Sequence, residues 1–239
     1  MARSTKRRHS TNKEQNAVGA CQLCGAKVER ARAALHCAEC ACAHDVSTGG
    51  LQQIVQLRAT SPGLPSYWID FEAKAEAKLE AIDAFLRRVW LECCGHLSVF
   101  RIGKVDYFSR GYEFGLVGAF GASGTECGMN IKLRDALRSS RFEYEYDFGS
   151  TTALELEVTG ERSGRIGRPA VRLLARNSAP VFPCATCGAP ATLICPYCIH
   201  EGTGAFTCHA HRDQHRCGEE EAFLPVVNSP RLGVCAYVG

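Results

Sequence analysis

Eight cysteine and histidine residues near the C-terminus have the spacing of metal ligands. They form four close pairs: Cys184-x2-Cys187, Cys195-x2-Cys198, Cys208-x2-His211 and His215-x-Cys217. A Cys-x2-Cys turn brings both sulfurs to the same side, and thiolate and imidazole are the ligands that structural zinc prefers. Eight such ligands predict two tetrahedral zinc sites.

The order of the pairs predicts which ligands share an ion. In a cross-brace the first pair joins the third, and the second joins the fourth. One site would then contain Cys184, Cys187, Cys208 and His211, and the other Cys195, Cys198, His215 and Cys217. His200 and His209 are expected outside both sites, with His209 the nearest rival of His211. This ending resembles the AN-one type of zinc finger, although the spacer between the two histidines is three residues instead of five. The resemblance implies a module that binds proteins.

A second cluster lies near the N-terminus and has more candidates than one ion can bind. It contains Cys21, Cys24, His36, Cys37, Cys40, Cys42 and His44. Cys21, Cys24, His36 and Cys40 would make a finger whose last two ligands lie one helical turn apart. Replacing His36 by Cys37 would give a zinc ribbon instead. The high helix propensity of residues 29–35 favours the finger.

Composition supports metal binding over disulfide formation. The 239 residues include 15 cysteines, and neither a signal peptide nor a long apolar run is visible. We therefore expect a cytoplasmic protein with reduced thiols and no membrane contact. The net charge of +3 comes from a basic tail, residues 1–18, which we expect to be disordered. This tail is the part of the chain through which nucleic acid could be bound.

The segment between the clusters, residues 50–178, has the patterns of an α+β domain. We expect strands at 51–57, 67–69, 97–102, 142–148, 154–158 and 171–175, a long helix at 72–93 ending before Gly95, and a short helix at 133–137. A glycine-rich stretch, 111–128, predicts a long loop or an irregular hairpin. These elements predict one main helix on a largely antiparallel sheet. The zinc modules would occupy residues 19–45 and 181–218, and residues 219–239 would form a tail packing on the core. Within that tail, residues 224–231 would fold back on the core as an added strand or meet a partner.

Two strings in this domain resemble a known family. They are Trp90-Leu91-Glu92-Cys93-Cys94-Gly95-His96-Leu97, followed by Phe100, and Tyr144-Glu145-Tyr146-Asp147-Phe148-Gly149. Both are similar to sequences of the plasmid pRiA4b ORF-3-like family, the passenger proteins of insertion elements. The resemblance covers roughly residues 50–160 and implies a compact α+β fold. It implies little about activity.

The ligand sets predict a binding protein. Each predicted site has four protein ligands, which is typical of structural zinc, whereas catalytic zinc keeps a position open. We expect about three zinc ions, a protein partner and no enzymatic activity. The alternative is a hydrolase or other enzyme in the central domain. It would use the acidic residues Glu143, Glu145 and Asp147, or the group Cys93, Cys94 and His96.

Overall fold

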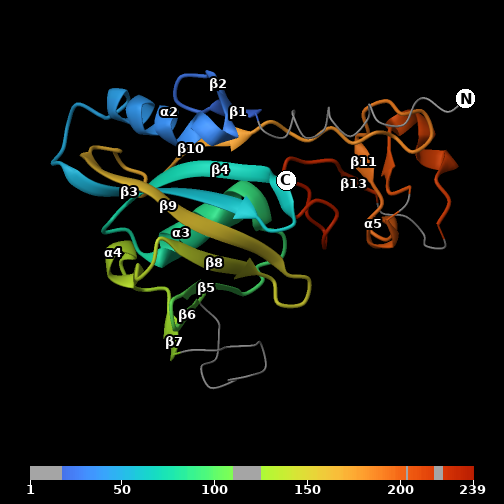
Figure 1. The fold of residues 1–239 in the computed structure, drawn as a ribbon. Coiled ribbons are helices and arrows are strands. Elements are labelled where there is room, and N and C mark those ends of the chain that lie inside the picture. Colours follow the sequence, from blue (N-terminus) through green and yellow to red (C-terminus); the bar gives the residue numbers. More distant parts are fainter. Residues whose placement is uncertain (1–17, 110–124, 203, 218–222) are drawn as a thin grey trace, which may run out of the picture.

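The protein is built on one large, strongly curved β-sheet (Figure 1). The computed structural model describes residues 18–109, 125–202, 204–217 and 223–239. Ten strands pair in the order β2-β1-β10-β4-β3-β9-β8-β5-β6-β7. Neighbours are antiparallel except β6 and β7. The strands are β1 (Val18–Cys21), β2 (Lys27–Glu29), β3 (Gln52–Ser61), β4 (Leu64–Lys74), β5 (Ser98–Ile102), β6 (Val105–Phe108), β7 (Thr125–Gly128), β8 (Arg141–Tyr146), β9 (Thr152–Gly164) and β10 (Val171–Asn177). The predicted α+β class is confirmed.

One face of the sheet packs on the main helix, α3 (Leu79–Leu86), which continues into a π-helical turn, Arg87–Leu91. Fully buried side chains of these two elements, among them Trp90, form the main core with buried side chains of the sheet such as Tyr144. The predicted helix started too early, because Glu72 lies in β4. Its neighbours Phe71 and Ala73 alternate with it across the sheet and belong to the core. Short stretches with a few apolar residues fit both periods, so the boundary could not be read from the pattern.

The opposite face of the sheet carries helix α2 (Arg30–Ala43) near one edge. Ala33, Cys37 and Ala41 of this helix are buried against Trp68 and Leu174 of the sheet. Strand β1 pairs with β10, so the N-terminal cysteine cluster is continuous with the main sheet. The basic tail lies outside the described residues, apart from Val18 at the start of β1.

The alternating segment forms the predicted hairpin. Phe142, Tyr144 and Tyr146 are buried on the core face of β8, and the strand turns back into β9 with Tyr146 opposite Thr152. Asp147 lies beyond the end of the strand. Most of the glycine-rich stretch is outside the described residues. Its last four form β7, and a short helix, α4 (Leu133–Ala136), follows.

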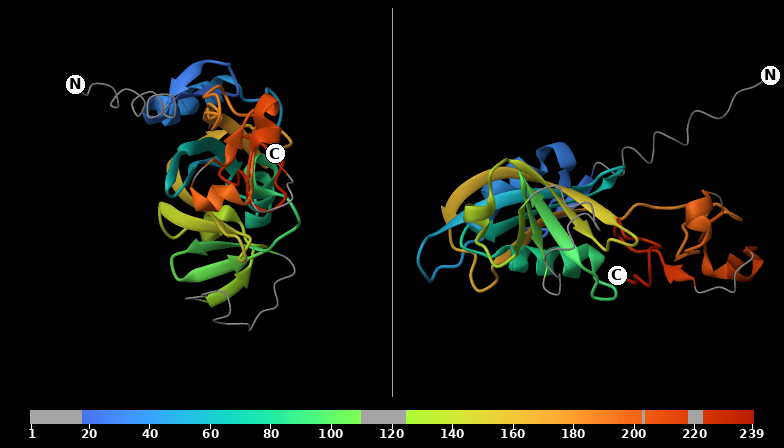
Figure 2. Two further views of the ribbon diagram at one scale, coloured as in Figure 1. Left: turned by 90° about the vertical axis from the view of Figure 1, so that its right-hand side faces the viewer. Right: turned by 90° about the horizontal axis from the view of Figure 1, so that it is seen from below.

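The C-terminal cluster folds as a small module that projects from one end of the sheet (Figure 2). It contains a three-stranded sheet, β12-β11-β13. The elements are β11 (Leu193–Ile194), α5 (Cys198–Glu201), β12 (Phe206–Thr207), a 3-10 helix (His209–Gln214) and β13 (Leu224–Pro225). Residues 224–231 do not add a strand to the main core as one reading predicted, because β13 pairs with β11 inside the module. Of the following residues, Ser229 and Arg231 contact the main domain. None of the helices in the described residues is long and apolar enough to cross a bilayer.

Candidate metal centres

The structure brings together each of the three ligand sets predicted from spacing. Within each set all four ligand atoms lie within 4.8 Å of one another. Zn–S and Zn–N bonds of about 2.3 and 2.0 Å at tetrahedral angles put two sulfurs about 3.8 Å apart, and a sulfur and a nitrogen about 3.5 Å apart. The side chains are thus spaced as a four-coordinate ion requires. The sets are Cys21, Cys24, His36 and Cys40; Cys184, Cys187, Cys208 and His211; and Cys195, Cys198, His215 and Cys217.

The N-terminal set is built from a strand end, a turn and a helix. Cys21 is the last residue of β1, and Cys24 lies in the turn to β2, where Gly25 has a φ of 75° that favours glycine. His36 and Cys40 are one turn apart on α2. The Sγ atoms of Cys21 and Cys40 are 3.7 Å apart, and Cys24 Sγ is 3.4 Å from His36 Nε2. These separations match the tetrahedral expectation.

Helix geometry decides between the two predicted N-terminal sets. Cys37 follows His36 by about 100° of helical rotation, which turns its thiol to the sheet. It is 2% exposed and packs with Ala33 and Trp68. Burial raises the pKa of the Cys37 thiol, which disfavours the thiolate that a metal needs. The finger with His36 is the arrangement that the structure contains.

Local electrostatics shifts the pKa values of two thiols of the N-terminal set in opposite directions. The backbone amide of Ala26 lowers the pKa of Cys24 to about 7. Burial, together with the neighbouring thiols of Cys24 and Cys21, raises the pKa of Cys40 to about 12. Three thiolates would repel one another at these distances, so all three could ionise together only with a bound cation.

The C-terminal module has the cross-brace arrangement. In the set of Cys184, the Sγ atoms of Cys187 and Cys208 are 3.9 Å apart, and Cys208 Sγ is 3.2 Å from His211 Nδ1. In the other set Cys198 Sγ is 3.4 Å from His215 Nε2. Of the His-x-His pair, His211 lies in the group with Cys184, Cys187 and Cys208. His209 belongs to none of the sets found among the described residues.

One cysteine of each set in the module has a pKa shifted in a different direction. Backbone amides, that of Cys187 above all, lower the pKa of Cys184 to about 5. Burial and the thiols of Cys195 and Cys217 raise the pKa of Cys198 to about 12. The surroundings of Cys184 therefore favour its thiolate, whereas those of Cys198 disfavour the thiolate unless a cation is bound.

The apolar core of this module is small. Its buried apolar cluster contains Ile194, Ala205 and Leu232 besides Cys195 and Cys198, and Ala191 is buried near it in sequence. The rings of Phe182 and Phe206 stack with centroids 4.2 Å apart. A unit of this size buries too little apolar surface to fold alone, and bound metal is the usual remedy.

A fourth Cys/His group was not predicted as a metal site. Cys93, Cys94 and His96 follow the π-helical turn, and Cys235 joins them from the C-terminal segment. The four ligand atoms again lie within 4.8 Å of one another. Sequence reasoning grouped Cys93, Cys94 and His96 but left out Cys235, because a lone cysteine about 140 residues away carries no spacing signal.

Of the acidic residues in the alternative enzyme hypothesis, Glu143 and Glu145 share a face of β8, whereas Asp147 lies beyond the end of the strand. Glu143 is exposed on β8, and Glu145 forms an ion pair with Arg101 at 3.0 Å. Asp147 has a φ of 64° and is buried, with its carboxylate 2.6 Å from the guanidinium of Arg231. The three carboxylates therefore do not converge on one reaction centre.

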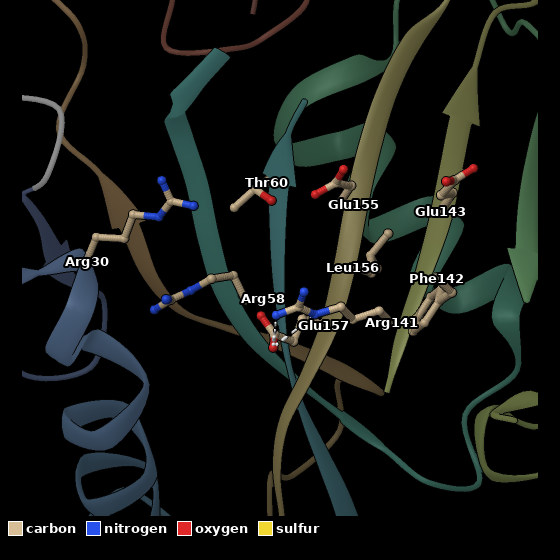
Figure 3. Close-up of a pocket in the computed structure, with 9 residues that line it drawn as sticks. All are labelled: Arg30, Arg58, Thr60, Arg141, Phe142, Glu143, Glu155, Leu156 and Glu157. Carbon is tan, nitrogen blue, oxygen red and sulfur yellow. Dashed lines mark hydrogen bonds and ion pairs between the residues drawn. The ribbon is translucent and has the colours of Figure 1, made fainter. Parts of the chain in front are cut away.

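A depression of about 460 Å³ lies on the outer face of the sheet beside the start of α2 (Figure 3). Its walls carry mixed charge. Arg30 donates to the carbonyl of Pro65, Arg58 is paired with Asp70, and Arg141 with Glu157. Glu143 and Glu155 face each other across β8 and β9. Arginine and glutamate are thus interspersed there, without the single sign of charge that selects a charged ligand.

Comparison with known proteins adds little about function. No family model matches the chain, and neither does any curated protein. Among solved structures, it is similar to the crystal structure of a protein of unknown function, MM3350, from Methanosarcina mazei Go1. The identity is 14% and the TM-score 0.44, over 52% of this chain and 70% of that one. The resemblance of residues 50–160 to the pRiA4b ORF-3-like family stays a prediction.

Proposed function

We propose that this chain is a non-enzymatic zinc-binding protein whose C-terminal module recognises a protein partner. The observation that supports the proposal most strongly is that each of the three predicted sets contains four ligand atoms from the chain itself. Each supplies three thiols and one imidazole at tetrahedral separations, so the chain itself fills every coordination position of the ion. Zinc held in this way supplies folding free energy and leaves no position for substrate or water.

Charge favours a protein partner over nucleic acid. Residues 181–217 carry Arg212 and Arg216 against Glu201 and Asp213, and are thus neutral. Residues 18–45 have three basic and three acidic side chains. Nucleic-acid binding relies on a basic face that replaces counterions, and neither module offers a charge surplus for it.

The module also presents a surface with the composition of a protein contact. A depression of about 500 Å³ is lined by Tyr197, Glu201, Gln214 and Arg216, among others. Tyr197 is 49% exposed although its ring is large and partly apolar. Tyrosine and arginine are enriched where proteins bind each other, which makes this depression the proposed contact surface.

Metal content tests the first half of the proposal. Native mass spectrometry of the full chain should find at least three zinc ions, and Cys24→Ser, Cys187→Ser and Cys198→Ser should each remove one. Cys127→Ser is the matched control, since Cys127 belongs to none of the four groups. A protein that binds no zinc while keeping its fold would refute the proposal.

Affinity capture from the native host tests the second half. A partner of the module should be retained by the wild-type chain and lost with Tyr197→Ala, but kept with Leu64→Ala. Leu64 is similarly exposed, at 47%, and lies on the main sheet. An electrophoretic shift with DNA or RNA that weakens steeply with salt, with no protein lost in the Tyr197 variant, would point to nucleic acid instead.

A further inference from the structure

The fourth Cys/His group has the composition and geometry of the three predicted sites. It contains Cys93, Cys94, His96 and Cys235, again three thiols and one imidazole. The Sγ atoms of Cys94 and Cys235 are 3.7 Å apart, and Cys235 Sγ is 3.7 Å from His96 Nε2. Both separations are close to those expected for tetrahedral zinc. We propose that these residues form a fourth zinc site, here called the C-terminal clasp.

Cysteine usage supports this assignment. Three cysteines in each of the four groups account for twelve of the fifteen in the chain. Cysteine is among the most buried residue types, yet Cys94 and Cys235 are exposed, each beside the other. Exposed reduced thiols are reactive, and coordination is the common reason for keeping several together.

The segment that brings Cys235 to the group is firmly anchored. The hydroxyl of Ser229 donates to the carbonyl of Trp90 at 2.6 Å. Arg231 has no exposed surface and donates to Thr152 Oγ1 at 3.0 Å as well as to Asp147. The approach of Cys235 to residues 93–96 is therefore fixed by buried contacts, unlike a chance meeting of two surface loops.

The surroundings of the group suit a bound ion of this kind. Zinc with three thiolates and one neutral imidazole carries a net charge of −1. The guanidinium of Arg231 lies 3.4 Å from Cys93 Sγ, where it can offset that charge. The hydroxyl of Tyr146 is 3.9 Å from the same sulfur. Asp147 Oδ2 is 3.7 Å from His96 Nε2, but that oxygen is the one that accepts from Arg231.

Backbone conformation gives a separate indication. Cys235 has a φ of 55°, one of two non-glycine residues with positive φ among the described residues. L-residues adopt this conformation at a cost in free energy, and such strained positions cluster where a ligand or site needs them. Asp147, the other such residue, lies beside the same group. The coordination of zinc would repay the cost at Cys235.

The clasp would tie the two parts of the molecule together. Leu232, three residues before Cys235, packs in the core of the C-terminal module, whereas Ser229 and Arg231 contact the main domain. An ion shared by Cys235 and residues 93–96 would therefore hold the module against the end of the sheet. This role is separate from the three predicted sites, which each lie within one module.

Zinc stoichiometry tests the clasp directly. Protein made with added zinc and purified with reductant should contain four ions by native mass spectrometry. Cys94→Ser and Cys235→Ser should each contain three, and Cys42→Ser, which alters an exposed cysteine outside the groups, should keep four. The Cys198→Ser variant should contain three zinc ions, because it loses one of the predicted sites. Thermal melting checks that each variant remains folded.

The outcomes separate the clasp from the proposed function. Three ions in the wild-type chain, unchanged by Cys235→Ser but reduced by Cys198→Ser, would overturn the clasp and leave the predicted sites intact. Three ions in the wild-type chain, with a Cys94–Cys235 disulfide located by peptide mapping of protein purified without reductant, would also overturn it. In support, amides of residues 228–237 should exchange hydrogen faster in Cys235→Ser than in the wild type, because the segment has lost its tether.

Discussion

At the scale of single residues, the direction of each side chain decides its chemistry. His36 and Cys37 are adjacent in sequence, yet one faces the N-terminal metal site and the other the core. Sequence left both choices open, with helix propensity favouring His36. The structure adds the reason: a ligand on α2 must lie one turn from Cys40, and His36 does.

We predict opposite effects of substitutions at these two positions. His36→Ala should remove one zinc ion per chain, because three ligands remain. Cys37→Ala should keep every zinc ion and lower the free energy of unfolding by about 1 kcal/mol, because a small buried group is lost. Zinc counting by native mass spectrometry and urea unfolding measure the two effects. Zinc loss in Cys37→Ala would favour the ribbon arrangement.

Arg231 provides a second residue-scale prediction. Its buried guanidinium is the partner of Asp147, whose pKa is lowered, against the effect of burial, by Arg231 and the amides of Ser150 and Gly149. Arg231→Met leaves that carboxylate buried without its cation, and should lower the free energy of unfolding by about 3–5 kcal/mol. Urea unfolding of Arg231→Met, Asp147→Asn and the double variant checks this. The free energy of unfolding should fall less in the double variant than the sum of its decreases in the two single variants. If the two decreases simply added up in the double variant, that result would contradict the pairing.

At the scale of elements, the sequence predicted the arrangement of residues that are close along the chain, but not the contacts between distant segments. The aromatic residues of β8 and the ligands of the cross-brace are close in sequence, so their spacing predicted their arrangement. Two contacts join segments more than 140 residues apart. They are the pairing of β1 with β10 and the contact of Cys235 with the group that contains Cys93. Nothing in a single sequence specifies such contacts, because loop closure permits many pairings of similar cost.

The carboxylate of Asp45, just after the end of α2, holds this end of the helix against the sheet. Asp45 accepts two hydrogen bonds from Arg162, at 2.8 and 3.0 Å, and one from the backbone amide of Arg165. Arg162 also pairs with the fully buried Glu72. Asp45→Asn should therefore lower the free energy of unfolding by about 1–2 kcal/mol at pH 7. Asp135→Asn, at an exposed position, serves as the control.

The pH dependence of this effect follows from the direction of the pKa shift. The hydrogen bonds from Arg162 lower the pKa of Asp45 in the folded state. A lowered folded pKa stabilises the protein above the unfolded pKa of about 3.9, and the contribution is lost as the pH falls through the folded value. The difference between wild type and Asp45→Asn should thus be full at pH 6 and shrink below pH 4. Urea unfolding at both pH values measures it; a difference that grew towards low pH would contradict the ion pair.

At the scale of the whole molecule, stability is unequally distributed. The main domain has a large apolar core on α3, whereas the C-terminal module has a small buried cluster of Ile194, Ala205 and Leu232 besides its cysteines. Zinc contributes about 10–16 kcal/mol to the folding of small metal-binding units, far more than that core can supply. The two parts should therefore respond differently when metal is removed.

Chelation should unfold the module and leave the sheet. After zinc removal at pH 7 under reducing conditions, amides of residues 182–217 should exchange hydrogen within seconds, while those of β3 and β4 keep their protection. Strand β1 should lose part of its protection, because the N-terminal site clamps its end to α2, although its pairing with β10 remains. Hydrogen exchange read by mass spectrometry resolves these segments, and Cys42→Ser should behave as the wild type. Protection of the module without metal would mean that its apolar contacts suffice, and that the Cys/His sets have a use other than holding the fold.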